Sequence, residues 1–90
     1  MDLTSTEARL VAKYKLQKHF ILDDNGNRKQ AGYEREISLN SYHGYMSFQG
    51  NWFLVLYYRA EDGTDNLFTK IISSNAWVFE KLVDTLNFDL

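Results

Sequence analysis

The sequence predicts an α+β fold, in which an antiparallel β-sheet of four to five strands carries a C-terminal α-helix packed on one face. Three patterns predict it. The residues from Trp52 to Tyr58 are all aromatic or aliphatic, which is typical of a strand. Asn25-Gly26 is a two-residue hairpin signal, because both positions tolerate positive φ. Apolar residues recur at helical spacing from Ala76 to Leu86. Ninety residues are the size of one domain, so we expect residues 1–90 to form a single domain.

The N-terminal part is expected to form a long hairpin. Apolar residues alternate with mostly polar neighbours from Ala8 to Leu22, which is the period of a strand. Setting Asp24 opposite Asn27 fixes a register with these pairs: Asp23 with Arg28, Lys15 with Glu36, Tyr14 with Ile37, Phe20 with Ala31 and Ala12 with Leu39. Thr4 with Glu7 fits a capping box, so one helical turn is expected near Thr4. The alternative is a full N-terminal helix that runs to about Lys18.

The C-terminal part is expected to contain three strands and a helix. Tyr42 to Phe48 forms one strand, and Gln49-Gly50-Asn51 turns the chain into the strand from Trp52. After a turn at residues 61–65, the strand from Asn66 to Ile72 returns. Its expected faces are Leu67, Thr69 and Ile71 on one side and Phe68, Lys70 and Ile72 on the other.

Ser73 or Ser74 is expected to cap the C-terminal helix. The apolar stripe of this helix consists of Ala76, Phe79, Leu82, Val83 and Leu86, and Trp77 and Asp84 lie off it. The tail from Asn87 to Leu90 is expected to fray.

Composition excludes several classes of site. The chain has no Cys, which rules out disulfides and thiolate metal sites. Its longest apolar run is far too short to span a bilayer, and the first residues lack a signal-peptide pattern. We therefore expect a small cytoplasmic protein with no membrane segment. The net charge of −2 is uneven, because residues 7–35 hold seven basic and four acidic residues and residues 60–90 hold two and six.

No catalytic or metal-binding motif is present, so no enzyme, cofactor or metal is expected. The chain lacks a Gly-rich phosphate loop, a pair of His residues at metal-ligand spacing and a nucleophile elbow. His19 and His43 are the only histidines. Residues 23–27 resemble the start of a calcium loop, but Arg28 stands where that loop needs Gly. We interpret this segment as a turn.

The aromatic residues are the strongest functional signal. Seven of them fall between Tyr42 and Tyr58. One helix covers only one face of a sheet, so the other face of the Trp52 strand must meet something else. A face with Phe53, Tyr57 and Arg59, beside Lys70 on the next strand, suits single-stranded nucleic acid, because bases stack on aromatic rings and cations neutralise phosphates. The same rings are also compatible with a core or with a dimer interface.

The C-terminal half also resembles a known family. Its order is Phe48-Gln49-Gly50 at a hairpin, a strand ending in Tyr57-Tyr58, a turn at Asp62-Gly63, and then residues 70–74 leading into Trp77 and Leu82. This order is similar to that of the positive cofactor four transcriptional coactivators and their bacterial and phage relatives, which share the topology of the Whirly group.

The resemblance covers about Tyr42 to Leu86 and implies four strands followed by a helix, a sheet that binds single-stranded DNA and a homodimer. It implies that Phe48 and Tyr58 stack on bases. The lysines that flank the hairpin Gly in the family are Gln49 and Asn51 here, which removes two phosphate contacts.

The predicted function is therefore a non-enzymatic, homodimeric protein that binds single-stranded nucleic acid. The predicted binding residues are Lys13, Lys15, Arg28, Phe48, Phe53, Tyr57, Tyr58, Arg59 and Lys70. The alternative function is a small phage-type inhibitor or adaptor that binds a host protein, which the small size and the acidic C-terminal part favour.

Overall fold

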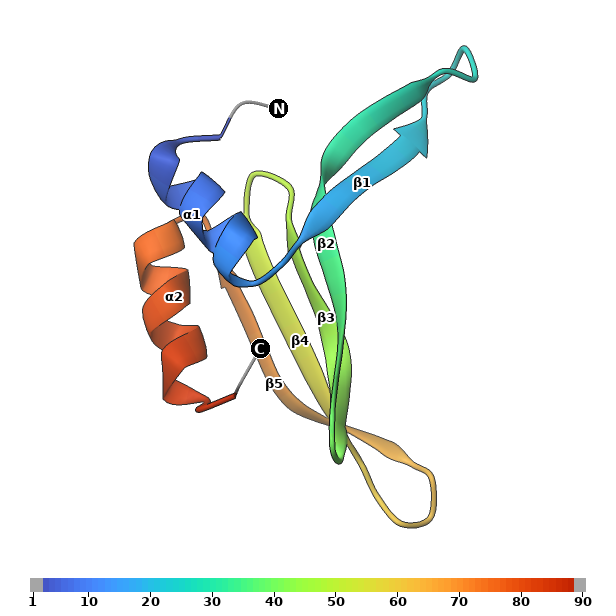
Figure 1. The fold of residues 1–90 in the computed structure, drawn as a ribbon. Helices are drawn as coiled ribbons and strands as arrows, with labels where there is room; N and C mark the ends of the chain where they lie inside the picture. Colours follow the sequence, from blue (N-terminus) through green and yellow to red (C-terminus); the bar gives the residue numbers. More distant parts are fainter. Residues whose placement is uncertain (1–2, 89–90) are drawn as a thin grey trace.

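Two helices and five antiparallel strands make up the computed structural model, which describes residues 3–88 (Figure 1). The elements in chain order are α1 (Ser5–Lys13), β1 (Gln17–Leu22), β2 (Arg28–Leu39), β3 (Tyr42–Phe48), β4 (Trp52–Arg59), β5 (Asp65–Ser73) and α2 (Ala76–Thr85). The strands form one sheet in the order β1-β2-β3-β4-β5, so each strand pairs with its neighbour in the sequence. This arrangement confirms the predicted α+β fold with a C-terminal helix.

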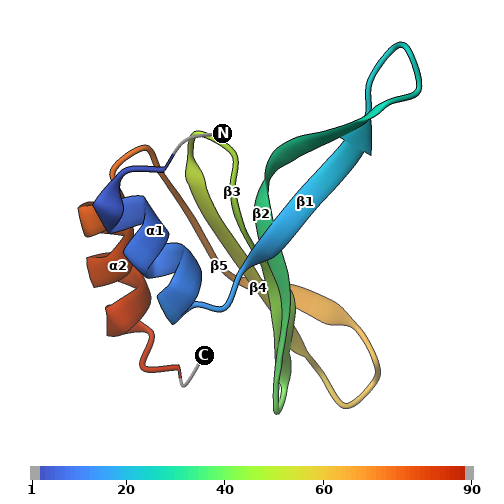
Figure 2. The ribbon, with the colours of Figure 1, turned by 45° about the horizontal axis from the view of Figure 1, so that its top comes forward.

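Both helices lie on the same face of the sheet, and no helix of residues 3–88 covers the opposite face, which we call the uncovered face (Figures 1 and 2). The core between helices and sheet centres on Trp52, whose ring lies 4.6 Å from that of Phe48 and stacks at 5.3 Å on that of Phe79 in α2. Leu54 and Leu56 follow Trp52 at alternate positions of β4 and are also fully buried. Because strand side chains alternate, Phe53, Val55 and the residues in step with them point to the uncovered face.

The expected strand from Ala8 is wrong, because residues 5–13 form α1. The predicted capping box is present: Thr4 Oγ1 accepts from the Glu7 amide, and the Glu7 carboxylate accepts from the Thr4 amide at 2.9 Å. Leu10 and Tyr14, four residues apart, fill the core, whereas Ala8 and Ala12 stay exposed. The apolar alternation that predicted a strand therefore includes two alanines, Ala8 and Ala12, that are not buried.

Helix α1 ends at Lys13 and is capped at Tyr14, so it is shorter than the alternative prediction of a helix that runs to about Lys18. Lys15 has a φ of 57°, and the Leu16 amide donates to the Val11 carbonyl at 2.9 Å. This left-handed residue reverses the chain direction and starts β1. The predicted pairs of Ala12, Tyr14 and Lys15 with β2 consequently do not form.

The hairpin between β1 and β2 exists, but its turn is longer than two residues. Asp23 donates its amide to the Asn27 carbonyl, and its carboxylate accepts from the amides of Asn25 and Asn27. Leu22 therefore pairs with Arg28, and Phe20 pairs with Gln30 and not with Ala31. The bulge at Ala31 restores the predicted register, in which Gln17 faces Glu34.

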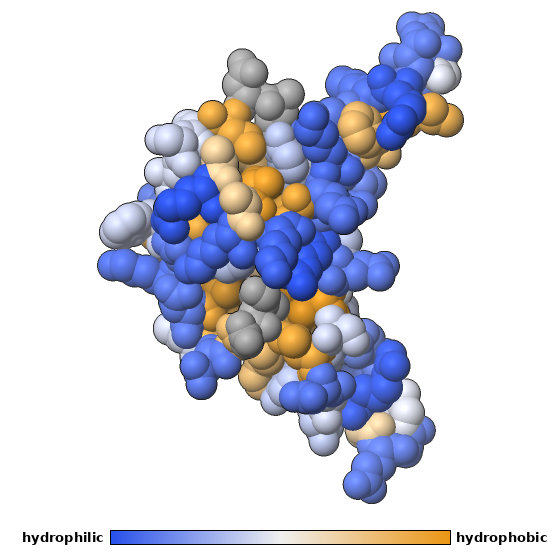
Figure 3. Space-filling model, viewed as in Figure 1, coloured by the Kyte–Doolittle hydropathy of each residue, from blue (hydrophilic) through white to orange (hydrophobic). Residues whose placement is uncertain are grey.

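The outer part of this hairpin, residues 19–32, projects from the body as an arm (Figures 1 and 2). The pairing of β2 with β3 starts only at Tyr33, so the arm is a two-stranded ribbon. Gly32 lies at its base with a φ of 146°, and a Cβ there would lie 2.3 Å from the Phe48 carbonyl oxygen. Phe20, Ile21 and Leu22 on the arm remain exposed, and Figure 3 shows apolar surface there.

Strand β5 contains a second bulge, so the residues on its two faces differ from those predicted. Leu56 pairs with Thr69 and Tyr57 pairs with Leu67, so Phe68 is the extra residue. Lys70 and Ile72 point to the uncovered face as predicted, and Leu67 joins them. Phe68 instead contacts the ring of Tyr42 at 4.6 Å.

Helix α2 is capped by Asn75, whose Oδ1 accepts from the Val78 amide at 3.1 Å, and not by Ser73 or Ser74. Ser73 instead bonds to the backbone of Asn75. The predicted stripe is correct at Ala76, Phe79 and Val83, which are buried, whereas Leu82 is exposed.

The predicted fraying of the tail is wrong for Phe88, which packs on Tyr42 with ring centroids 5.4 Å apart. Residues 89–90 of that prediction lie outside the described residues. No helix within residues 3–88 is both long enough and apolar enough to cross a membrane.

Glu80 connects the two helices. Arg9 donates to its two carboxylate oxygens at 2.9 and 2.7 Å, and Lys13 donates at 2.7 Å. Hydrogen bonds from these two cations hold the pKa of Glu80 at about 2. Only 13% of the Glu80 side chain is exposed, although the side chains of Arg9 and Lys13 are about half exposed.

We expect Trp52→Ala to lower the free energy of unfolding by about 3–5 kcal/mol, because it removes the ring between Phe48 and Phe79 and leaves a cavity. Phe53→Ala, at the next position of β4 on the uncovered face, is the control and should lower the free energy of unfolding clearly less. Equilibrium unfolding in urea measures both variants. An equal loss for the two would contradict the assignment of the core face.

We expect Glu80→Gln to reduce stability at neutral pH by about 1–2 kcal/mol, after discounting for the exposure of the cations. Folding lowers the pKa of Glu80 from 4.5 to about 2. Its contribution is therefore complete above about pH 4.5 and is lost as the pH falls towards 2. Thermal unfolding of wild type and variant should thus converge in acid. Glu61→Gln, in the exposed β4–β5 loop, changes the charge equally and should follow the wild type.

Candidate binding face of the sheet

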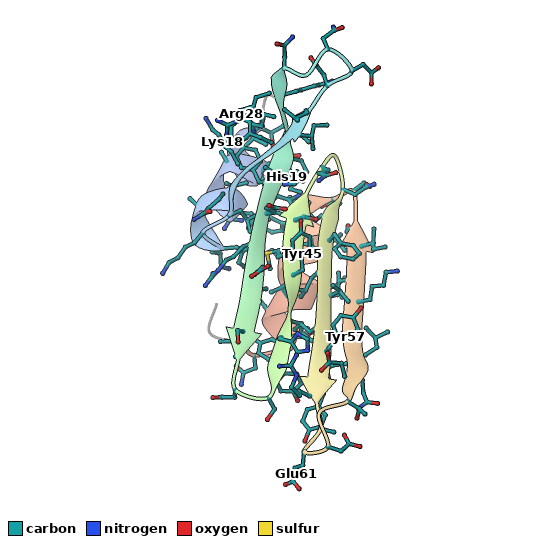
Figure 4. All side chains as sticks on the ribbon, turned by 90° about the vertical axis from the view of Figure 1, so that its right-hand side faces the viewer. Lys18, His19, Arg28, Tyr45, Tyr57 and Glu61 are labelled. Atoms are coloured by element: carbon teal, nitrogen blue, oxygen red, sulfur yellow. The ribbon has the colours of Figure 1, made fainter. Side chains whose placement is uncertain are left out.

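The uncovered face of the sheet, which we call the open face, is the candidate site (Figure 4). Residues directly opposite each other on paired strands share a face, so the register defines its members. They are Gln17 and His19 of β1, Glu34, Glu36 and Ser38 of β2, His43, Tyr45 and Ser47 of β3, Phe53, Val55, Tyr57 and Arg59 of β4, and Asp65, Leu67, Lys70 and Ile72 of β5.

Glu34 organises the β1–β3 half of this face. His19 Nδ1 lies 2.9 Å from one of its oxygens, and the Tyr45 hydroxyl donates to the other. These hydrogen bonds lower the pKa of Glu34. Burial, together with the acceptor Glu34, raises the pKa of Tyr45 to about 12. Tyr45 is therefore a neutral, fixed ring in the middle of the open face.

A second polar cluster lies at the far end of β4. Arg59 Nε donates to Asp65 Oδ1 at 3.0 Å, and His43 Nε2 lies 3.0 Å from the same oxygen. The hydrogen bonds from Arg59 and His43 lower the pKa of Asp65. The His43 ring lies 5.8 Å from that of Tyr57, tilted by 31°. Tyr57 is thereby supported on one side and 36% exposed to solvent.

Phe53 and Lys70 form the third group. Lys70 Nζ lies 6.0 Å from the centre of the Phe53 ring, at the outer limit of a cation–π contact. Among residues 3–88, no carboxylate forms an ion pair with Lys70. Its charge is therefore available to an anionic partner, whereas that of Arg59 is already shared with Asp65.

Charge divides the open face across its width. Glu34 and Glu36 lie on β2, whereas the β4–β5 side carries Lys70 together with the ion pair of Arg59 and Asp65. Between them is a shallow depression lined by Glu36, Ser38, His43, Tyr45, Val55 and Tyr57. The arrangement can hold a flat or extended partner against its rings, with anions favoured on the β4–β5 side.

The nine predicted binding residues are not brought together. Phe53, Tyr57, Arg59 and Lys70 share the open face. Phe48 is buried beside Trp52, so it has no free ring face for a base, and Tyr58 lies on the helix-bearing face against Tyr42. Sequence alternation alone could have separated Tyr58 from Tyr57.

The predicted basic residues of the N-terminal part are also dispersed. Lys13 is paired with Glu80, Lys15 lies in the turn after α1, and Arg28 covers the Phe20 ring on the arm at 4.3 Å. The sequence did not indicate that His19, Glu34 and Tyr45 meet, because they come from three strands. The predicted register already sets Gln17 opposite Glu34, with His19 two residues along β1 on the same face, whereas the pairing of β2 with β3 adds Tyr45.

Within residues 3–88, no three His, Asp or Glu side chains gather closely enough to hold a metal ion. Comparison of the chain with models of protein families, with curated proteins and with solved structures finds no match. The open face is therefore interpreted from its own chemistry.

We expect Glu34→Gln to lower the pKa of Tyr45 from about 12, because the neutral amide no longer disfavours the phenolate. NMR titration of ring-labelled tyrosines measures this shift. Tyr14 is an internal control, since burial raises its pKa to about 12 at a distance from Glu34. An unchanged Tyr45 titration would show that burial alone sets its pKa.

Proposed function

We propose that the protein is a small non-enzymatic module that binds single-stranded nucleic acid on its open face. Phe53 and Tyr57 stack on bases in this proposal, and Lys70 contacts phosphate. The observation that carries it is the presence, on the sheet face opposite the two helices, of two aromatic rings and of Lys70, which pairs with no carboxylate among residues 3–88. The resemblance implies four strands followed by a helix, and β2 to β5 followed by α2 have this order, although β2 lies before the stretch from Tyr42 to Leu86 that the resemblance covers.

The spacing along β4 fits an extended polymer. Phe53 and Tyr57 are four residues apart on one strand, about 13 Å at the rise of a strand. Val55 lies between them and presents a small apolar surface on which a sugar or base edge can rest. Stacking on such rings contributes roughly 1–3 kcal/mol per base.

Charge indicates the path of the bound strand. Glu34 and Glu36 repel phosphates from the β2 side, so the backbone is expected to follow β4 and β5 past Lys70. On the open face, Lys70 is the one cation without a carboxylate partner among residues 3–88, so the electrostatic contribution is weak, and the overall charge of −2 adds no attraction. The proposed affinity therefore depends mainly on stacking and is only weakly sensitive to salt.

We expect Tyr57→Ala to weaken binding of a fluorescent oligothymidine of about twenty nucleotides by roughly 5- to 150-fold, the loss of one stacked base. Fluorescence anisotropy at low salt measures the affinity. Tyr58→Ala is a matched control, because the adjacent tyrosine is similarly exposed on the opposite face. It should bind like the wild type.

Two outcomes would contradict the proposal. One is the absence of any anisotropy change with the wild-type protein at low salt. The other is an equal loss of affinity in Tyr57→Ala and Tyr58→Ala, which would mean that binding does not use the open face.

A second candidate function is protein binding through the arm. Phe20, Ile21 and Leu22 are consecutive exposed apolar residues on a two-stranded ribbon, which is marginally stable unless something covers it. Such a surface suits a small inhibitor or adaptor that inserts the arm into a groove of a host protein. Failure of the oligonucleotide experiment would favour this function.

A further inference from the structure

One row of side chains crosses the open face from β2 to β5. Glu36 pairs with Tyr45, Tyr45 with Val55 and Val55 with Lys70, so all four lie on one line across the strands. The strands of Glu36 and Lys70 are three spacings apart, which is about 14 Å. A carboxylate therefore ends the row on β2, and an ammonium group ends it on β5.

Glu36 is an acceptor that the fold itself does not use. Its side chain is exposed, and it forms no ion pair with any residue from 3 to 88. Glu34 and Asp65 on the same face instead accept hydrogen bonds from neighbouring side chains. The Tyr45 hydroxyl donates to Glu34, so it does not occupy Glu36. The oxygens of Glu36 are thus available to a ligand.

The depression in the middle of the open face lies between this carboxylate and the rings. Glu36 and Ser38 line it on the β2 side, Val55 and Tyr57 line it on the β4 side, and its volume is about 390 Å³. This volume is in the range of small-molecule sites, so a planar base has room in it.

The proposed path of the nucleic acid directs the edge of a base towards Glu36. The phosphates follow β4 and β5 past Lys70, and a base stacks on Tyr57. In a nucleotide the sugar and phosphate are attached at one side of the base, and its Watson–Crick edge lies at the other side. That edge is open to protein contacts in a single strand. A base stacked on Tyr57 therefore extends over β3 and presents its Watson–Crick edge to Glu36.

We propose that Glu36 makes the open face selective for guanine among the bases of a bound single strand. A carboxylate only accepts hydrogen bonds, and its two oxygens suit two adjacent donors. Guanine has such a pair on its Watson–Crick edge, at N1–H and the N2 amino group. The selectivity rests on the proposed function, because only a base stacked on the open face reaches Glu36.

The other bases fit the carboxylate less well. In cytosine and in adenine the amino group adjoins a ring nitrogen that is an acceptor, and in thymine N3–H lies between two carbonyl oxygens. Each of these acceptors repels a carboxylate oxygen placed beside it. Affinity and selectivity are thus contributed by opposite ends of the row, because Lys70 attracts phosphate whatever the sequence and Glu36 distinguishes the bases.

Fluorescence anisotropy with three oligonucleotides of about twenty nucleotides tests the selectivity. The first is oligothymidine, the second carries isolated guanines separated by thymines, and the third carries inosine in place of each guanine. The wild type should bind the guanine oligonucleotide at least about fivefold more tightly than oligothymidine, the lower end for a bidentate contact. Inosine lacks the N2 amino group, so the third oligonucleotide should bind more weakly than the second.

Glu36→Gln should lose the preference for guanine, because the neutral amide turns an N–H2 group towards the donors of guanine. It should bind oligothymidine at least as tightly as the wild type, since a negative charge has been removed from the face. Glu61→Gln is the matched control. It removes the same charge in the exposed loop between β4 and β5, at the far end of the molecule, and should keep the preference (Figure 4).

Three results would overturn the selectivity: equal binding of the guanine and thymine oligonucleotides, equal binding of guanine and inosine, or a guanine preference that persists in Glu36→Gln. A carboxylate that instead receives a cationic side chain of a protein partner would give the first result. The proposed function would still stand in each case if Tyr57→Ala weakened binding. Absence of binding to all three oligonucleotides would contradict the proposed function itself.

Discussion

The stack of Phe48, Trp52 and Phe79 is the interaction on which the rest of the structure depends. It joins the β3–β4 hairpin to α2, and its rings are almost completely removed from water. Three aromatic rings supply a large part of the apolar area that a chain of this size can bury. The ion pairs of Glu80 then hold α1 beside α2, so that both helices share one face.

This one-sided packing creates the open face. With Trp52, Leu54 and Leu56 committed to the core, strand geometry sends Phe53, Val55 and Tyr57 to the other side. Two aromatic residues that the core does not use, Phe53 and Tyr57, therefore lie along β4 on the open face, where Phe53 is half-buried and Tyr57 is exposed. The proposed nucleic-acid surface is thus a consequence of a small core.

Prediction from the sequence succeeded where local pattern and burial agree. The strands from Tyr42 to Arg59 and the helix from Ala76 were predictable, because dense apolar runs and a helical stripe have few alternatives. Prediction failed at residues 8–16, where strand and helix patterns overlapped. The capping box and the left-handed Lys15 decided for the helix, and Lys15 gave no sequence signal, because Gly usually holds that position.

The candidate site divides in the same way. The sequence by itself determined that Phe53, Tyr57 and Arg59 share a face, since the period of a strand fixes this whatever surrounds it. It also determined that the chain has more aromatic rings than one helix can cover. Only the tertiary structure decided which face is covered, that Phe48 belongs to the core, and that His19, Glu34 and Tyr45 meet. Those facts depend on the pairing of strands that are distant in the sequence and on where the helices pack, which are set by long-range packing and not by neighbouring residues.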